Sequence, residues 1–490
     1  MKQLVTLIFI FLGPLAILAQ SSDCIRDFNY LVKKIEADYP GYTDKVTAET
    51  SGELQALEQH LRAKIDQYPD SCGRYLNQYA TWFRDYHLKV RGKWRSKSSA
   101  TGTTELPNPE FIPLTEESIK MLGKKTDGIE GIWISFRGKI AVLKKPGSDK
   151  YIGIAIQFAG YEPDQVMYEF TSNPENEYDL ISFPDYNNFR PIIGQASLHL
   201  GGEILELHDN TRFVRQSGSD ISDNALLYSY QPEFPNGTNT FPLAINLTDS
   251  TFYLRIPTFG TDYAETLVTK HWQEITSRPN LIIDIRNNGG GQDNFYQPLS
   301  KLIYTYPYKS KGVEWYATPA HIKLFEDALL NGKIKDGEEG IAWTNALLGE
   351  MRTNIGGFVI HPMMGRDELV VEDTVYAYPR RVGIIINENN GSSAEQFILG
   401  AKESDKVILF GNQNTAGVLD YSNAVREDFP SGNYELNFPM TRSRRLPEMP
   451  IDNIGIAPEV IIPYPSTPQL YDRLDQWVYF VKYYLELMEQ

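Results

Sequence analysis

The chain has 490 residues, of which 41% are hydrophobic and 12% aromatic, and its formal net charge is −16. Such an acidic chain is poorly suited to bind nucleic acid or an anionic membrane surface, so we expect neither as a partner. At roughly 100–200 residues per domain the length predicts two or three domains. The 30 Tyr and 23 Phe favour a β-rich component.

Residues 1–19 predict a secretory signal peptide. Lys2 precedes an unbroken apolar stretch, and small residues surround Ala19, after which we place the cleavage site. No other stretch approaches the roughly 20 apolar residues that a membrane span needs. We therefore expect an exported protein, periplasmic or extracellular, without a membrane span in the mature chain. The oligomeric state is open.

Residues 20–95 predict a small helical region. The stretches "FNYLVKKIEADYPGY" and "ELQALEQHLRAKIDQY" both carry apolar residues at spacings of three and four. The two cysteines of the chain, Cys24 and Cys72, lie here. In an oxidising compartment a disulfide between them is favoured over a metal site, with two unpaired buried thiols as the alternative.

Two regions of different character follow. The polar residues after Trp94 predict a linker over 96–128. From 129 to 250 short segments such as "GIWISF", "KIAVLKK" and "YIGIAIQF" alternate apolar and polar residues between turn signals. This alternation is typical of antiparallel strands and predicts a β-rich domain, either a small barrel or a sandwich.

The region 251–465 predicts a parallel sheet. Continuous apolar runs, "NLIIDIR", "RVGIIIN" and "KVILFGN", are separated by helical patterns, and strands buried on both faces and joined by helices form parallel sheets. Sites in such sheets gather beyond the carboxyl ends of the strands. A C-terminal helix is expected within 466–490.

Ser392 lies at one of these strand ends and has two interpretations. It is followed by Glu395 three residues later and then by apolar residues at helical spacing, which predicts a helix N-cap. A hydroxyl displayed at the positive end of a helix could also be a nucleophile.

Acyl transfer by serine also needs backbone donors for the oxyanion and a base. Gly289, Gly290 and Gly291 follow another strand end, where their N–H groups could form an oxyanion hole, and the amide of Ser393 could be a second donor. The alternative is a flexible turn. The loop is not a phosphate loop, because no Gly-Lys-Ser/Thr follows it.

Seven histidines are candidates for the base: His60, His87, His199, His208, His271, His321 and His361. No pair has metal-ligand spacing with a third partner, so we expect neither a zinc hydrolase nor another cofactor. His87 stands out because it follows Asp85 at a transition between helical and extended patterns.

Four stretches in order, "LIIDIRNNGGG", "VGIIINENNGSSAEQF", "VILFGNQNTAGV" and "IDNIGIAPEV", resemble the core motifs of the tail-specific, or C-terminal processing, serine peptidases. The tricorn core and retinoid-binding-protein-like members are included in this resemblance, which covers about 251–465. It implies a crotonase-like spiral αβ core and peptide-bond hydrolysis. The whole chain is then an α+β multidomain protein, with a helical N-terminal region and a β-rich middle domain.

The resemblance also implies roles for residues. The family's nucleophile lies three residues before the motif Glu, which is Ser392 here rather than Ser393. One branch of the family uses a Lys just after a "T-x-G" segment, but Val418 occupies that place. The other branch uses a His from a "D-G-H-T"-like motif and an acidic residue shortly before "G-x-x-P-D". Those positions are His87 and Asp452.

Three departures from the family pattern concern the base more than the fold. Tyr86 and Leu88 stand where the family has Gly and Thr, and Glu459 replaces an Asp. In tricorn-like members a Ser beside the His helps to orient it, and Tyr86 occupies its place.

The sequence thus predicts an exported serine peptidase that acts on peptides or proteins through Ser392, His87 and Asp452. The alternative is an inactive family member that binds peptides, lipids or glycans. Ser392 alone does not decide between them, because a serine N-cap stabilises a helix by roughly 1 kcal/mol over alanine.

Overall fold

The computed structural model describes most of the chain, and the described segments are 13–68, 71–92, 109–125, 127–135, 137–173, 177–184, 191–209, 211–216, 242–334, 337–364, 367–465 and 474–488. Residues 1–12 of the predicted signal peptide, and residues 96–108 and 126 of the predicted linker, lie outside these residues. Within them, no helix combines the length and the apolar character needed to cross a bilayer.

The chain divides into two compact units that are not consecutive stretches. Unit 1 contains Met1–Arg95, Pro307–Val371 and Ala416–Gly455, and unit 2 contains Ser96–Tyr306, Glu372–Thr415 and Ile456–Gln490. Both units therefore draw on the region 251–465 that the sequence groups into one core.

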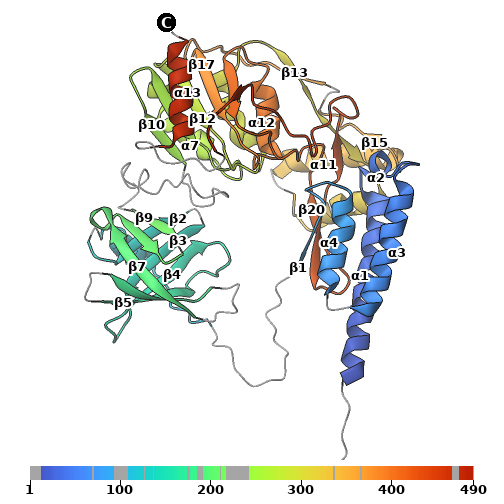
Figure 1. The fold of residues 1–490 in the computed structure, drawn as a ribbon, viewed down its shortest axis with the longest axis horizontal. Helices are drawn as coiled ribbons and strands as arrows, with labels where there is room; N and C mark the ends of the chain where they lie inside the picture. The colour runs from blue at the N-terminus through green and yellow to red at the C-terminus, as the bar shows by residue number, and fades with distance from the viewer. Residues whose placement is uncertain are drawn as a thin grey trace, which may run out of the picture. The chain divides into compact units, whose positions relative to one another are not determined.

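Unit 1 begins with the predicted helical region, drawn in blue in Figure 1. Its helices are α1 (Gly13–Asp38), α2 (Tyr42–Lys45), α3 (Ser51–Gln67) and α4 (Cys72–Trp82). Their apolar faces share one core, which includes Phe28, Leu61 and Leu76, all fully buried. The spacings of three and four seen in the sequence correspond to these buried faces.

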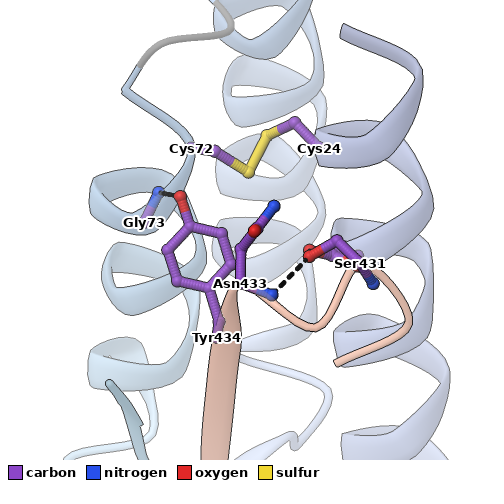
Figure 2. The surroundings of a disulfide bond; sticks show 7 residues. Cys24, Cys72, Gly73, Ser431, Asn433 and Tyr434 are labelled. Atoms are coloured by element: carbon purple, nitrogen blue, oxygen red, sulfur yellow. Dashed lines mark hydrogen bonds between the residues drawn. A yellow bond between two sulfur atoms is a disulfide. The ribbon is translucent and has the colours of Figure 1, made fainter. Parts of the chain in front are cut away.

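A disulfide joins Cys24 of α1 to Cys72 of α4, with the two Cα atoms 5.6 Å apart (Figure 2). The pairing is the one that the sequence favours. Beside it, the Tyr434 hydroxyl accepts a hydrogen bond from the Gly73 N–H at 3.1 Å. A residue some 360 positions downstream is therefore packed against the start of α4.

Tyr434 belongs to a three-stranded antiparallel sheet in the order β1 (Lys89–Gly92), β21 (Tyr434–Phe438) and β20 (Val425–Asp428). Leu436 and Phe438 of β21 are fully buried in the core of the N-terminal helices. The strand β1 follows α4 after a short loop, and this loop carries His87.

The remaining elements of unit 1 form two more sheets and a helical hairpin. A four-stranded sheet has the order β15 (Phe358–Val359), β14 (Val313–Tyr316), β22 (Thr441–Ser443) and β19 (Tyr421–Ser422). The strands β13 (Tyr308–Lys311) and β16 (Asp367–Val370) pair with each other. The helices α10 (Pro319–Leu330) and α11 (Gly337–Thr353) pack on Trp315 of β14.

The predicted β-rich region is a closed eight-stranded barrel within unit 2. Its strands are β2 (Gly131–Ser135), β3 (Gly138–Lys144), β4 (Tyr151–Phe158), β5 (Val166–Ser172), β6 (Tyr178–Ser182), β7 (Ile192–His199), β8 (Ile204–Leu207) and β9 (Arg212–Gln216). Closure is made by antiparallel pairing of β2 with β9. Side chains such as Trp133, Phe170 and Phe213 fill the interior. A short helix, α5 (Glu116–Leu122), lies in the predicted linker and packs on the barrel.

The core of unit 2 is a six-stranded sheet in the order β10 (Leu243–Asn246), β11 (Thr251–Arg255), β12 (Asn280–Asp284), β17 (Arg381–Ile385), β18 (Val407–Gly411) and β23 (Val460–Ile461). All neighbours from β11 to β23 are parallel, as the continuous apolar runs predict. β10, on the other side of the predicted boundary at 250, pairs antiparallel with β11.

Helices connect and cover these strands. They are α7 (Tyr263–Lys270), α8 (Trp272–Thr276), α9 (Gln297–Ile303), α12 (Ser393–Ala401) and the C-terminal α13 (Gln476–Leu487). In Figure 1 α13 lies along the sheet, and its Trp477 and Val481 pack against Ile282 of β12. β12 and β17 are parallel neighbours, so the loops at their carboxyl ends meet at one edge of the sheet.

Candidate active site

Ser392 lies in the loop between β17 and α12, one residue before the helix begins. It is the N-cap by position, but its side chain makes no hydrogen bond to the helix. Its backbone has φ 56° and ψ −127°, whereas a capping serine normally lies in the β region. A positive φ at a non-glycine residue is uncommon and is often retained at functional sites.

The predicted capping interaction between Ser392 and Glu395 is therefore wrong. Glu395 is fully buried, and its carboxylate accepts a hydrogen bond from the Thr415 hydroxyl at 2.5 Å. Thr415 in turn accepts the Ile456 N–H at 2.8 Å. The glutamate thus ties α12 to two later loops of unit 2, and no described residue hydrogen-bonds the Ser392 hydroxyl.

The glycine loop after β12 closely approaches Ser392. Gly290 has φ 101°, and a Cβ placed on it would lie 2.8 Å from Ser392 Cβ and 2.7 Å from the Gly391 carbonyl oxygen. Only glycine fits such a close approach at a positive φ. The Ser393 hydroxyl donates to the Gly291 carbonyl at 3.1 Å, so the loop and the start of α12 are also joined directly.

The hydrogen bonds distinguish between the predicted oxyanion donors. The Gly290 N–H donates to the Asn288 side chain at 3.0 Å, so it is engaged within the loop. The N–H groups of Gly289 and Ser393 make no hydrogen bond to any described residue, and Ser393 opens the helix, where N–H groups are unpaired. These two remain as donors for an oxyanion.

Asparagine side chains hold the two loops together. Asn387 accepts the Asn287 N–H at 2.8 Å, and its amide donates to the Asn287 side chain at 2.8 Å. Asn390 donates to the Ile285 carbonyl. No local pattern in the sequence indicates this role for Asn387 and Asn390. Asn288, two positions before Gly290, does carry a signal, because Asn side chains often bond the backbone two residues on in a turn.

His87 lies in unit 1, in the loop between α4 and β1. Its backbone N–H donates to the Asp85 carboxylate at 2.8 Å, and its carbonyl accepts from the Asn437 amide at 2.6 Å. Its Nδ1 is buried and has no partner among the described residues. The backbone of His87 is therefore fixed on both sides, while one ring nitrogen is left unpaired.

Asp452 lies in the same unit, in a turn after β22. One carboxylate oxygen accepts the N–H groups of Leu419 and Asp420 at 2.9 and 2.8 Å. The other, Oδ2, is buried without a partner in the described part of the chain. Burial, together with the negative charge of Asp85, raises the pKa of Asp452 to about 7. No hydrogen bond joins Asp452 to His87.

Two further histidines are buried, but their contacts are structural. His321 Nδ1 lies 2.8 Å from the Tyr316 carbonyl oxygen, and His361 stacks on Trp343 while its Nε2 lies 2.9 Å from that residue's carbonyl oxygen. The described residues contain no cluster of three or more His, Cys, Asp or Glu suited to a metal ion.

The predicted site residues thus form two groups. Unit 2 brings Ser392, Ser393 and the glycine loop together, and unit 1 carries His87 and Asp452. The first group is a strained serine at a helix N-terminus beside two unpaired amides, an arrangement suited to acyl transfer.

The sequence profile of peptidase family S41 matches residues 250–462. The segment 250–462 of this chain belongs to peptidase family S41. The matched segment contains every strand of the six-stranded sheet except β10, together with Ser392, the glycine loop and Asp452. His87 lies outside it. No curated protein matches the chain.

Solved structures resemble this chain over nearly its whole length. Mature CPAF complexed with lactacystin has a TM-score of 0.51 at 14% identity, covering 96% of this chain and 99% of that one. A second structure of mature CPAF gives the same score and identity, covering 98% of that chain. At such low identity these matches show a shared fold alone, and the shared fold extends to the barrel and the N-terminal helices. The tricorn protease is similar at a TM-score of 0.42 and 12% identity, over 96% of this chain and 37% of that one.

Proposed function

We propose that this chain is an exported serine peptidase that cleaves peptide bonds through an acyl-enzyme on Ser392. In this proposal His87 is the general base and Asp452 orients its imidazole. The observation that carries it is Ser392 itself. Ser392 was expected to cap α12 with its side chain, but it has a φ of 56° and its hydroxyl makes no hydrogen bond to the helix. It lies beside Gly290, which no other residue could replace without strain.

In the proposed mechanism, Ser392 Oγ attacks the carbonyl carbon of the scissile bond while His87 Nε2 accepts the hydroxyl proton. The carbonyl π electrons move onto oxygen, and the N–H groups of Gly289 and Ser393 donate to this oxyanion. One such donor typically contributes about 2.7–4 kcal/mol of transition-state stabilisation. The N-terminus of α12 adds a favourable dipole.

Collapse of the intermediate breaks the C–N bond, and the leaving amine takes the proton from His87. A water molecule then repeats the sequence on the acyl-enzyme, giving its proton to His87 and releasing the acid and the free Ser392 hydroxyl. Asp452 contributes if it is ionised, because its free Oδ2 can then accept the Nδ1–H of the imidazole. Both atoms are buried and unpaired.

The test uses purified mature protein, residues 20–490, and a fluorophosphonate probe. We expect the wild type to be labelled and Ser392→Ala to be unlabelled. Ser393→Ala is the matched control, because it removes the neighbouring hydroxyl but keeps the N–H, and it should still be labelled. His87→Gln should slow labelling by roughly 10²–10⁴-fold.

Labelling of Ser392→Ala at the wild-type rate would refute the assignment of the nucleophile. A folded wild-type protein that is never labelled, and that cleaves no peptide in a mixed peptide library, would instead support the alternative of an inactive member that binds peptides, lipids or glycans.

We further propose that the protein is exported. The predicted signal peptide supports this, as does the disulfide between Cys24 and Cys72, because disulfides persist in oxidising compartments and are rare in the cytosol.

A further inference from the structure

The loop that carries His87 is anchored at successive positions by other parts of unit 1. Lys45 Nζ of α2 donates to the Phe83 carbonyl at 2.7 Å. The Asn453 amide donates to the Arg84 carbonyl at 2.7 Å. Arg84 has a φ of 49°, which is uncommon for a side chain of this size. The loop is therefore held in a conformation that its own sequence does not favour.

Asp85 is the centre of this arrangement. Its carboxylate is 4% exposed and makes two charge-assisted hydrogen bonds, from the His87 N–H at 2.8 Å and from the Tyr39 hydroxyl at 2.9 Å. Tyr39 follows α1 and is 1% exposed. The carboxylate thus connects the end of α1 to the backbone of the proposed base, across 46 residues of sequence.

The same loop is connected to the turn that carries the proposed orienting acid. Asn453, which bonds the Arg84 carbonyl, is the residue after Asp452 and has a φ of 62°. Its own N–H donates to the Gly417 carbonyl at 3.1 Å. A Cβ on Gly417 would lie 2.6 Å from the Ile451 carbonyl oxygen, so this turn too has little freedom to shift.

We infer that Asp85, anchored by the Tyr39 hydroxyl, is a positioning residue that fixes the His87 loop against the turn bearing Asp452. The inference rests on the proposed function, because it assigns a role in placing the base and its partner. Asp85 itself touches no reacting atom. It acts through the His87 backbone and through its charge.

The charge of Asp85 matters because Asp452 can accept the imidazole N–H only when it is ionised. Burial and then Asp85 raise the pKa of Asp452, and the like charge of Asp420 acts in the same direction. Lys45 acts in the opposite direction, as do the N–H donors. The titratable and charged groups near Asp452 lie just after α1, in α2, in the His87 loop, in and just before β19, and in the loop after β22. They are Tyr39, Lys45, Asp85, Asp420, Tyr421 and Arg445.

Removing the charge of Asp85 should therefore lower the pKa of Asp452. Ionised Asp452 would then persist to lower pH, and the acidic limb of the activity profile should move in the same direction. Asp85→Asn is the suitable change, because its amide oxygen can still accept the His87 N–H. We expect the acidic limb of the labelling rate to move to lower pH by about half to one unit.

Tyr39→Phe tests the anchor with the carboxylate left in place. It deletes one buried hydroxyl and should reduce the labelling rate by roughly 3- to 10-fold. Tyr42→Phe is its control, because the Tyr42 ring packs on Phe83 of the same loop and its hydroxyl bonds no described residue. Asp27→Asn is the control for Asp85→Asn. Asp27 is buried in the same unit and also bonds a loop, at Ser431.

The experiment records fluorophosphonate labelling rates of wild type and these four variants from pH 5 to 9, with circular dichroism to verify folding. The inference stands if Asp85→Asn moves the acidic limb, Tyr39→Phe slows labelling, and both controls match the wild type. If Asp85→Asn labels more slowly without a shift of the acidic limb, Asp85 has only a structural role. If Tyr39→Phe labels at the wild-type rate, the Tyr39 hydroxyl does not anchor Asp85. Either result overturns the inference.

These results can be distinguished from failure of the proposed function. If the proposed function is wrong, the wild type is not labelled, or the Ser392→Ala variant is labelled as fast as the wild type. The role of Asp85 is then refuted together with the mechanism. If Asp85→Asn does not fold, the labelling rate of Tyr39→Phe compared with that of Tyr42→Phe decides whether the inference stands.

Discussion

Ser392 and Gly290 show that the proposed catalytic geometry depends on backbone conformation. Ser392 has a positive φ although it is not a glycine. Gly290 lies so close to it that a Cβ atom on Gly290 would clash with the Ser392 side chain. Strain of this kind costs of order 1–3 kcal/mol and persists only where the surroundings impose it. Asparagine hydrogen bonds join the loop that carries Gly290 to the loop that carries Ser392.

Gly290→Ala should disturb this geometry. The new methyl group would lie within 3 Å of the Gly391 carbonyl oxygen, Ser392 Cβ and Ser393 N, and the backbone would be strained at φ 101°. We expect the fluorophosphonate labelling rate to fall by roughly 10- to 100-fold, because small displacements at reacting groups carry large rate penalties. Gly52→Ala, with open space around its Cβ, should label like the wild type. Equal labelling of Gly290→Ala would contradict the close approach.

At the scale of elements, a buried ion network connects the central sheet of unit 2 to the C-terminal helix. Arg286, just after β12, bonds Asp284 and, at 2.8 Å, Asp475. Asp475 is fully buried and is also the N-cap of α13, where its other oxygen accepts the Trp477 N–H at 2.8 Å. The network lies directly before the glycine loop, so it supports the strand from which that loop starts.

Asp475→Ala should strongly destabilise the protein. It removes the helix cap and leaves the Arg286 guanidinium without one of its buried partners, which typically costs about 3–5 kcal/mol. Asp475→Asn keeps the capping oxygen and should lose less. Urea unfolding followed by tryptophan fluorescence measures both changes.

Asp327→Ala is the matched control on the surface. Its ion pair with Lys323 is largely exposed and is expected to contribute less than about 1 kcal/mol. If Asp475→Ala and Asp327→Ala shifted the unfolding midpoint equally, the buried network would have no special role in stability.

At the scale of the whole molecule, unit 1 is assembled from three separated segments. Its N-terminal helices pack on β21, which lies more than 340 residues downstream of α4. The disulfide closes a span of 48 residues within this assembly. A cross-link of this size restricts the unfolded chain and typically stabilises by about 2–4 kcal/mol.

The double variant Cys24→Ser/Cys72→Ser should therefore unfold at a lower urea concentration than the wild type. Reduction of the wild type with dithiothreitol should lower the midpoint by a similar amount and leave the double variant unchanged. If the oxidised wild type and the double variant unfolded at the same midpoint, the disulfide would not contribute to stability. Recovery of the disulfide from protein made only in the cytosol would weaken the proposal of export.

The sequence by itself determined the local elements and the family of the segment 250–462. A helix buried on one face has apolar residues at spacings of three and four, and this pattern identified the N-terminal helices. A strand buried on one face alternates apolar and polar residues, and this pattern identified the barrel strands. Strands buried on both faces are continuous apolar runs, and these identified the parallel strands. It also located Ser392 and the glycine loop at the carboxyl ends of two strands that proved to be neighbours.

Only the tertiary structure decided how these elements are partitioned and what individual side chains do. The sequence shows neither that Glu395 bonds Thr415 instead of capping its helix, nor that Asn288 engages the Gly290 N–H, nor that Tyr39 anchors Asp85. Two of these contacts join residues far apart in the chain. All three depend on which competing donor or acceptor lies within hydrogen-bonding distance once the backbone has folded, and no local pattern encodes that.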